Sequence, residues 1–260
     1  MIKVVILAAG QGTRLRPYTD DKPKCLVEIF GKTILEHQID TFKKCGIIDI
    51  NIVTGFKSKQ IKDLGYKTSS NNNYKRTNMV SSLFSAKEFI SSCKNEDLII
   101  SYGDIIFQKE NLEKLIDSHS ELSIMNDKSW EQLWKLRMSD PLEDAETFIL
   151  DNSNYVIELG KKPKNYESIQ GQFTGLIKVD KSKIDDIIET YYSLDKTNMY
   201  DGKDYDNMFM TSFIQLLIDL GWKVKAVDVN NGWLEVDTAE DLLLYEKLKR
   251  NKRLSRFYKF

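Results

Sequence analysis

The chain has 260 residues, of which 41% are hydrophobic and 30% charged, a composition typical of soluble globular proteins. Its 38 basic and 39 acidic residues leave a net charge of −1, which argues against a protein that covers nucleic acid with a broad basic face. The three cysteines match no metal or redox spacing, so we expect a reducing, cytoplasmic location. No apolar run approaches the roughly 18 residues of a membrane span, so we expect no stable membrane insertion. The apolar segment 4–9 is too short for the core of a signal peptide.

The first half of the chain predicts strands and helices in alternation. Residues 2–8 are continuously apolar, as in a strand that is buried on both faces. A loop with two glycines and two prolines follows. The remaining apolar periodicity predicts, in chain order, a helix over 32–45, a strand over 48–54, helices over 57–64 and 78–90, a strand over 98–102 and a helix over 109–119.

The second half begins with a region rich in short strands. We expect strands over 121–126, 132–138, 146–150, 155–159 and 172–179, then helices over 181–193 and 205–220, strands over 223–229 and 233–236, and a closing helix over 238–249. Thr238 and Asp241 are spaced as a capping box at the start of that helix.

This order of elements predicts one α/β domain over residues 1–250. We expect a Rossmann-like mixed, mostly parallel sheet flanked by helices, with a strand-rich insertion near 121–179. Residues 251–260 form a basic and aromatic C-terminal tail, either a solvated helix end or a docking segment. Residues 247–260 carry a net charge of +7 and residues 1–24 a net charge of +3, so the small total charge conceals two local basic clusters.

The first basic cluster lies on the glycine loop after the first strand. Gly10-Gln11-Gly12-Thr13-Arg14-Leu15 lacks the third glycine of a dinucleotide fingerprint, and the chain has no P-loop motif. Glycines let backbone N–H groups approach an anion closely. Arg14 can form two parallel hydrogen bonds to phosphate oxygens, and Lys24 adds a single compact positive charge. The cluster therefore indicates a polyphosphate site; the alternative is a solvated loop whose charges Asp20 and Asp21 offset.

Two aspartates are candidate metal ligands. Asp104 follows the strand over 98–102 and Asp237 follows the strand over 233–236. Both therefore lie with the glycine loop at the carboxyl ends of strands, where open α/β sheets bind ligands. Mg²⁺ binds one or two carboxylates together with water and phosphate oxygens. Each aspartate alone also fits an ordinary role, in a Gly-Asp turn or at a helix N-terminus.

The loop carries a resemblance that extends to the whole chain. Leu7-Ala8-Ala9-Gly10-x-Gly12-Thr13-Arg14-Leu15-x-Pro17-x-Thr19, followed by Pro23-Lys24-x-Leu26, resembles the signature of the sugar-phosphate nucleotidylyltransferases. The resemblance implies the nucleotide-diphospho-sugar transferase-like fold, with Arg14 and Lys24 as catalytic residues and Asp104 and Asp237 as Mg²⁺ ligands. It also implies nucleotide binding by Leu7, Ala8, Ala9, Gly10, Gly12, Thr13, Arg14 and Gly103.

A second segment is similar to the phosphocholine-cytidylyltransferase branch of that family. The segment is Asn71-x-x-Tyr74-x-x-x-Asn78-x-x-x-Ser82-Leu83, and Asp206-Asn207-Met208 adds to the similarity. The resemblance implies CTP as the nucleotide, with Asn71, Asn78 and Ser82 in contact with the nucleotide or the acceptor. Asn78 is alternatively a simple helix cap.

The acceptor site is less marked. Glu158-Leu159-Gly160-Lys161-Lys162-Pro163 resembles the family's Glu-Lys-Pro element, whose lysine holds the acceptor phosphate, so Lys161 or Lys162 is the candidate. Arg137 and Lys135 can hold an amino-acid carboxylate, and Asp204 or Asp206 its ammonium. A quaternary amine would need an aromatic cage, for which Trp130, Trp134 and Trp233 are available unless they belong to the core.

The sequence thus predicts an Mg²⁺-dependent cytidylyltransferase. It would transfer CMP from CTP to the phosphate of a small acceptor and release pyrophosphate, in a pathway that modifies capsule or other cell-surface polysaccharide. We expect phosphoglutamine ahead of phosphocholine. An acceptor phosphate is largely dianionic near neutral pH and can itself attack, so no side-chain nucleophile is needed. The alternatives are a hexose-1-phosphate enzyme that uses UTP, dTTP or GTP, and a nucleotide-binding regulator without turnover.

Overall fold

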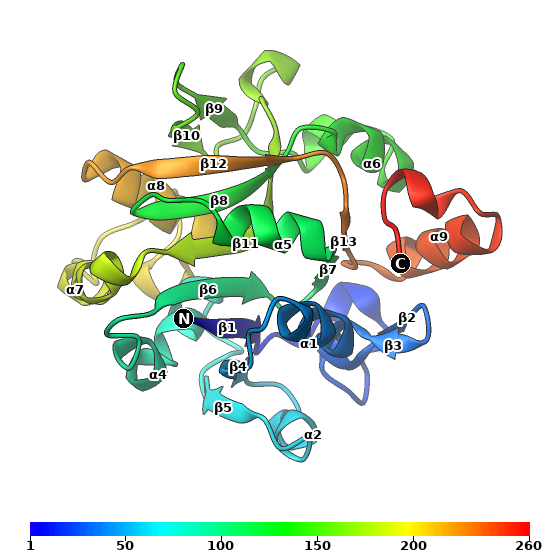
Figure 1. Ribbon diagram of the computed structural model, residues 1–260, viewed down its shortest axis with the longest axis horizontal. Helices are drawn as coiled ribbons and strands as arrows, with labels where there is room; N and C mark the ends of the chain where they lie inside the picture. Colours follow the sequence, from blue (N-terminus) through cyan, green and yellow to red (C-terminus); the bar gives the residue numbers. More distant parts are fainter.

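The computed structural model describes residues 1–260 and is built on one seven-stranded sheet (Figure 1). The strand order is β12-β8-β11-β6-β1-β4-β5. Strand β11 runs antiparallel to β6 and β8, and all the other neighbours are parallel. The predicted mixed, mostly parallel sheet is confirmed. Its strands are β1 (Ile2–Ala8), β4 (Ile50–Thr54), β5 (Lys67–Ser70), β6 (Asp97–Tyr102), β8 (Leu122–Asp127), β11 (Gln172–Val179) and β12 (Val224–Val229).

Helices cover both faces of the sheet and divide the core into two clusters. In β1, Val4 and Ile6 face one cluster while Val5 and Leu7 face the other, because successive strand residues point to opposite faces. The first cluster includes residues of α1 (Ile34–Lys44), α2 (Ser58–Lys62), α5 (Lys109–Ile116), α6 (Trp130–Arg137) and α9 (Ala239–Arg250). The second includes residues of α3 (Met79–Phe84), α4 (Lys87–Ser91), α7 (Ile184–Ser193) and α8 (Met210–Asp219). None of the helices is both long and apolar enough to cross a membrane.

Three short strand pairs complete the fold. Strand β7 (Ile105–Phe107) pairs antiparallel with β13 (Trp233–Glu235), β9 (Phe148–Leu150) pairs with β10 (Val156–Leu159), and β2 (Glu28–Ile29) pairs with β3 (Lys32–Thr33). The β7–β13 pair matters most for the site. It brings the chain after β6 against the chain before α9, and the Val236 N–H donates to the Asp104 carbonyl at 2.9 Å.

Several predicted elements differ from the structure. The sequence predicts a strand over 132–138, but residues 132–137 belong to helix α6, because Trp130, Leu133 and Trp134 bury one helical face at spacings of three and four. The predicted helix 78–90 is broken near Ser85 into α3 and α4. The helix expected from 205 begins at Met210, after a single 3₁₀ turn. The predicted capping box of α9 is confirmed, since Thr238 and Asp241 bond each other's backbone N–H groups.

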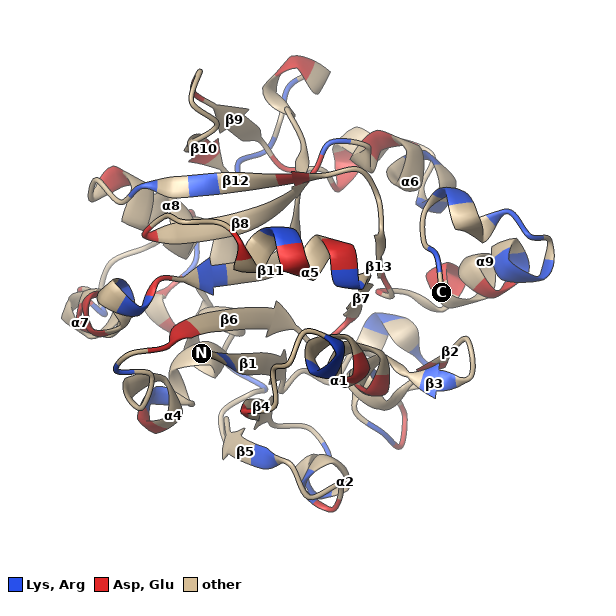
Figure 2. Cartoon of the chain, viewed as in Figure 1, with Lys and Arg blue, Asp and Glu red and all other residues tan.

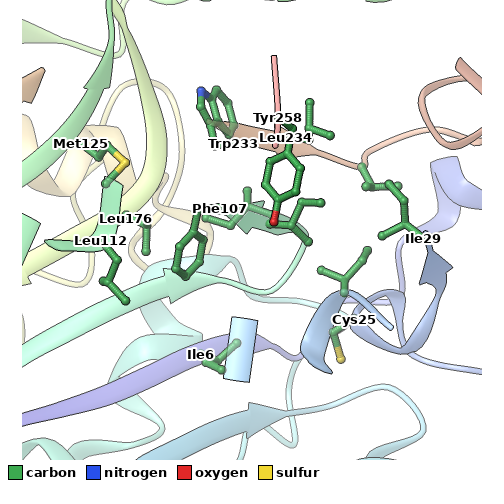
Figure 3. Close-up of a cluster of buried hydrophobic side chains, with 14 of the residues drawn as sticks. Ile6, Cys25, Ile29, Phe107, Leu112, Met125, Leu176, Trp233, Leu234 and Tyr258 are labelled. Atoms are coloured by element: carbon green, nitrogen blue, oxygen red, sulfur yellow. The ribbon is translucent and has the colours of Figure 1, made fainter. Parts of the chain in front are cut away.

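The C-terminal segment packs against the same domain. Leu254, Phe257 and Tyr258 are buried in the first core cluster, and the Gly232 N–H donates to the Phe257 carbonyl at 2.7 Å. Figure 3 shows Tyr258 among buried side chains that include Leu234. The basic residues of the segment are exposed, and Figure 2 shows how they colour this end of the chain. The apolar side of the segment therefore belongs to the core.

Candidate functional site

The glycine loop begins where β1 ends. Gly12 has a φ of 67°, in the left-handed region that favours glycine, and a Cβ there would lie 2.8 Å from Lys24 Cβ. The Thr19 hydroxyl donates to the Gly12 carbonyl at 2.7 Å, and Leu15 is fully buried beneath the loop. The loop is thus fixed by its own contacts, and Gly12 leaves room for the stem of Lys24.

Lys24 is the centre of an ion-pair cluster. Its Nζ lies 2.8 Å from Asp104 Oδ2 and 2.8 Å from Asp237 Oδ1. Arg14 Nη1 lies 2.6 Å from Asp237 Oδ2. Burial opposes the charged form of Lys24, but Asp104 and Asp237 outweigh it and raise the pKa of the ammonium. The structure therefore brings together the four residues for which the resemblance implies catalytic and metal-binding roles.

Asp104 reaches this cluster because Gly103 passes close to β1. The Gly103 N–H donates to the Leu7 carbonyl at 2.9 Å, and a Cβ at Gly103 would lie 2.4 Å from that same oxygen. Only glycine fits this approach. Asp237 comes from the other side, from the end of the β7–β13 pair.

The two carboxylates fit a divalent cation. One ammonium contacts both, so a single ion placed there would also reach both. Asp104 Oδ1 is buried and has no hydrogen-bond partner, which leaves a carboxylate oxygen free to bind a cation. No group of three or more His, Cys, Asp or Glu side chains in the chain could hold a metal ion. Two oxygen ligands with room for water and phosphate suit Mg²⁺.

A cavity of about 330 Å³ opens beside the cluster. It contains most of the residues expected to bind nucleotide. The lining residues are Leu7, Ala8, Gly10, Gly12, Thr13, Arg14, Lys24, Cys25, Asn78, Met79, Tyr102, Gly103, Asp104 and Asp237. Backbone, cationic side chains and carboxylates meet here, an arrangement that can hold a polyphosphate and a metal together.

The three polar residues of the cytidylyltransferase-like segment have different positions. Asn78 lines the cavity, and its Oδ1 accepts from the Met79 N–H at 2.8 Å as the N-cap of α3. Asn71 and Ser82 lie behind it, outside the cavity lining. Asn71 Nδ2 donates to Ser82 Oγ and to Thr77 Oγ1, each at 2.9 Å. This buried hydrogen-bond network fixes the chain around Asn78.

The lysines predicted to hold the acceptor phosphate lie outside this cavity and outside a second cavity that adjoins it. Lys161 is exposed, and its Nζ pairs with Glu158 Oε2 at 2.8 Å. The Lys162 ammonium donates to the carbonyls of Leu142 and Glu143. The backbone of Lys161 is bonded to Thr147 in both directions, which holds this turn beside the segment that carries Glu146.

Arg137 and Asp206 occupy structural positions. Arg137 is buried and forms a two-pronged pair with Asp241, with Nε to Oδ1 at 2.9 Å and Nη2 to Oδ2 at 3.1 Å. Its Nη1 also lies 2.9 Å from Glu235 Oε2, as an ion pair that does not meet the geometry of a hydrogen bond. The carbonyl of Asp206 accepts from the Asn78 N–H at 2.9 Å, so Asp206 supports a lining residue of the first cavity through its backbone and does not line the cavity itself.

A second cavity of about 180 Å³ adjoins the first, and Met79 and Tyr102 line both. Trp134 and Trp233, predicted as cage candidates, line it; Trp130 instead packs against Trp134 and Tyr166. The full lining is Met79, Tyr102, Trp134, Asp144, Glu146, Gln172, Phe173, Thr174, Gly175, Phe209, Met210, Thr211, Trp233 and Glu235.

Sequence reasoning missed the acidic residues of this second cavity. Asp144 and Glu146 stand in a polar run before a short strand, and nothing in their spacing indicates a site. The sequence also does not predict Glu235 as a site residue, because the family motif at this position points to its neighbour Asp237. Burial and the nearby Asp144 raise the pKa of the Glu146 carboxyl to about 7. Burial also raises the pKa of Glu235, against the opposing effect of Arg137.

A glycine loop whose two cations contact two carboxylates, next to the ends of β1 and β6 in a mostly parallel sheet, is an arrangement suited to a nucleotidyltransferase. Residues 4–131 match the model of the MobA-like NTP transferase domain. The chain also has a fold like that of the CTP:phosphocholine cytidylyltransferase from Streptococcus pneumoniae. The TM-score is 0.68 at 20% identity, and the match covers 95% of this chain and 99% of the other.

Relatives with higher identity place the chain within this class. It is 42% identical over 248 residues to the CTP:phosphoglutamine cytidylyltransferase of Campylobacter jejuni, a match that covers 93% of this chain and 98% of the relative. It is 40% identical over 95 residues to the choline-phosphate cytidylyltransferase of Streptococcus pneumoniae, which covers 35% of this chain and 42% of the relative. The chain belongs to the cytidylyltransferase family of nucleotidyltransferases.

Proposed function

We propose that the chain transfers CMP from CTP to the phosphate of phosphoglutamine and releases pyrophosphate, with Mg²⁺ as its cofactor. The observation that carries the proposal is the cluster of Lys24, Arg14, Asp104 and Asp237 at the mouth of the glycine-loop cavity. The choice of CTP and phosphoglutamine rests on the 42% identity to the Campylobacter jejuni enzyme, which extends over nearly its full length.

The residues of the first cavity suit the nucleotide. The backbone of the glycine loop borders the triphosphate, while Lys24 and Arg14 stabilise negative charge as the α-phosphorus is attacked. Asp104 and Asp237 would hold the Mg²⁺, which neutralises charge on the phosphates when it is bound. Lys24 contacts both aspartates, so binding of substrate and metal would redistribute its contacts.

The acceptor would enter from the second cavity. Because Met79 and Tyr102 line both cavities, an acceptor in the second one can bring its phosphate to the nucleotide. Alignment of this phosphate supplies much of the rate enhancement, and no general base is required. No histidine lines either cavity. We propose Lys161 as the residue that contacts the acceptor phosphate, after release from Glu158, with Lys162 as the alternative.

Phosphocholine is the second candidate acceptor. The aromatic side chains of the second cavity favour it, because indole faces attract quaternary ammonium groups. For either acceptor, we propose a cytoplasmic location, in keeping with three unpaired cysteines, and a product used to modify capsule or other cell-surface polysaccharide.

Pyrophosphate release from a matrix of substrates tests the proposal. The purified protein is incubated with Mg²⁺, each of CTP, UTP, dTTP and GTP, and each of phosphoglutamine, phosphocholine and glucose 1-phosphate. We expect the highest kcat/KM with CTP and phosphoglutamine, and loss of activity when EDTA removes the metal. Preference for another pair would replace these substrates. No pyrophosphate from any pair would overturn the assignment as an active enzyme.

A further inference from the structure

The second cavity has an uncompensated negative charge. Three carboxylates line it, from Asp144, Glu146 and Glu235, and no lysine or arginine does. Glu235 is paired with Arg137 behind the wall, and Asp144 lies at the exposed rim, where it accepts from Trp134 Nε1 at 3.1 Å. Glu146 is half-buried and forms no salt bridge. The cavity is therefore suited to a cation.

Glu146 is held firmly in place. Its carbonyl accepts from Gln172 Nε2 at 2.7 Å, and its N–H donates to Gln172 Oε1 at 3.3 Å. This double contact anchors the segment to β11, the strand that contributes Gln172, Phe173, Thr174 and Gly175 to the lining of the cavity. A carboxylate in such a position is preorganised to bind a ligand.

The cavity also has an unsatisfied hydroxyl. Thr174 lines it and is 2% exposed, yet its Oγ1 has no hydrogen-bond partner. A buried hydroxyl without a partner is costly and points to a group that is supplied from elsewhere. The Trp134 and Trp233 N–H groups are already bonded, to Asp144 and to Asp127. The indoles thus supply contact area without a free donor.

The spacing from the metal site suits one small acceptor. Glu235 is two residues before Asp237, so their Cα atoms are at most about 7 Å apart. A molecule with its phosphate at the Asp104–Asp237 cluster would place a group a few bonds away in the second cavity. This position corresponds to the end of the acceptor that is distant from its phosphate.

We propose that Glu146 determines acceptor specificity by accepting hydrogen bonds from a primary ammonium at that distant end, with Thr174 Oγ1 as a further acceptor. This inference rests on the proposed function and specifies its substrate class as phosphorylated primary amines. A quaternary ammonium has no N–H to donate, so it could form no hydrogen bond with Glu146 or with the unsatisfied Thr174 Oγ1. A neutral hydroxyl would leave the negative charge of Glu146 uncompensated.

The test compares three acceptors of similar size: phosphoethanolamine, phosphocholine and 2-hydroxyethyl phosphate, each with CTP and Mg²⁺. Phosphoglutamine serves as the reference substrate. We expect kcat/KM for phosphoethanolamine to exceed that for the other two small acceptors by about tenfold or more. Glu146→Gln should remove this preference and leave the KM for CTP unchanged. Thr174→Val, which keeps the side-chain volume, should reduce the preference several-fold.

The controls separate specificity from folding. Glu143→Gln changes an exposed carboxylate in the same segment, outside the cavity, and should keep the wild-type ranking. The Tm of Glu146→Gln at pH 8 should equal or exceed that of wild type, because the substitution removes a half-buried charge that has no salt bridge.

The outcomes distinguish the two proposals. If the wild type uses 2-hydroxyethyl phosphate as well as phosphoethanolamine, or Glu146→Gln keeps the preference, the role of Glu146 is overturned while the cytidylyltransferase assignment stands. If no acceptor, phosphoglutamine included, releases pyrophosphate with CTP, the proposed function itself fails, and this inference fails with it.

Discussion

The two cavities of the site are built in opposite ways. The first takes most of its lining from residues 7–25 and adds residues from the start of α3 and from the ends of β6 and β13. The second collects side chains from α6, β11, α8, β13 and the connection before β9. The first cavity is thus lined mainly by one sequence motif, whereas the second is lined by segments that are distant in the chain. Under the proposed function, nucleotide binding would depend mainly on local structure, whereas acceptor selection would depend on tertiary packing.

Their electrostatics differ in the same way. In the first cavity, two cations face two carboxylates, so charge is balanced before any substrate binds. In the second, three carboxylates have one buried arginine behind them, and Asp241 shares that arginine. Under the proposed function, the first cavity would exchange these ion pairs for contacts with metal and nucleotide, whereas the second would take up a cation.

The largest expected effect on turnover comes from removing one charge from the cluster of Lys24, Arg14, Asp104 and Asp237. Asp104→Asn should lower kcat by at least about a hundredfold, because the metal and Lys24 both lose a charged partner. Tm should change little, since the side chain keeps its shape. Asp117→Asn, at an exposed position after α5, is the matched control and should keep normal turnover. Pyrophosphate release at saturating CTP measures both; near-normal activity of Asp104→Asn would remove this residue from the metal site.

A second prediction concerns Lys24 as a competitor of the metal. Its ammonium occupies the space between the two carboxylates, so a divalent ion must displace it. Without nucleotide, Lys24→Met should bind Mn²⁺ about tenfold or more tightly than the wild type, because two free carboxylates then face the ion. Mn²⁺ titration followed by electron paramagnetic resonance gives both affinities. Equal affinities would mean that the metal binds elsewhere.

The third prediction uses pH to test whether the Glu146 carboxylate of the second cavity binds the ammonium of the acceptor. The pKa of Glu146 is about 7, so this carboxylate is protonated below neutrality and loses its attraction for an ammonium. The KM for an amine acceptor should therefore rise about tenfold per pH unit below pH 6, and more steeply than in Glu146→Gln. Asp144 and Glu235 face the same cavity and hold the pKa of Glu146 up. The variant corrects for titration of the acceptor phosphate, which also occurs near pH 6.

The raised pKa of Glu146 also predicts how the stability of the fold depends on pH. A folded-state pKa above the ordinary glutamate value means that the folded protein holds a proton that the unfolded chain releases. The contribution of Glu146 to stability is thus present below the unfolded pKa and is lost as pH rises towards 7. Thermal unfolding between pH 5 and pH 8 should show this loss in the wild type and not in Glu146→Gln. Parallel curves would contradict it.

The smallest effects are expected at the two lysines after β10. Lys161→Ala should raise the acceptor KM only a few-fold with unchanged Tm, because exposed charge pairs are screened by water. Lys162→Ala should instead lower Tm slightly, because its ammonium bonds two carbonyls of the segment before Glu146. The reverse pattern would make Lys162 the residue that contacts acceptor phosphate.

The contrast between the cavities explains what the sequence could predict. The strand over residues 2–8, the capping box of α9 and the two aspartates proposed as metal ligands follow local patterns, and the structure confirms the two elements and brings the aspartates together. The helix α6 was misjudged because two tryptophans in a short polar segment suit either a strand or a helix. Glu146 could not be found, since its environment is created by β11 and α8, which are distant in the chain.

Arg137 illustrates the same limit. In the sequence, Arg137 is a cation in a predicted strand and therefore a candidate to bind a carboxylate of the substrate. The structure places it instead between Glu235 and Asp241, which is also the capping residue of α9. No local pattern predicts such a pairing, because the partners are about a hundred residues away.

The contact between Lys24 and Asp237 spans 213 residues of chain. Contacts of such long range form late in folding, because a large loop must close before they yield any stabilisation. The first 107 residues therefore contain the glycine loop and one proposed metal ligand, yet they cannot complete the ion-pair cluster by themselves. In refolding from denaturant, recovery of turnover should follow the slowest phase, after most of the secondary structure has returned. On the ribosome, the growing chain would stay inert towards nucleotide until the segment with Asp237 has emerged.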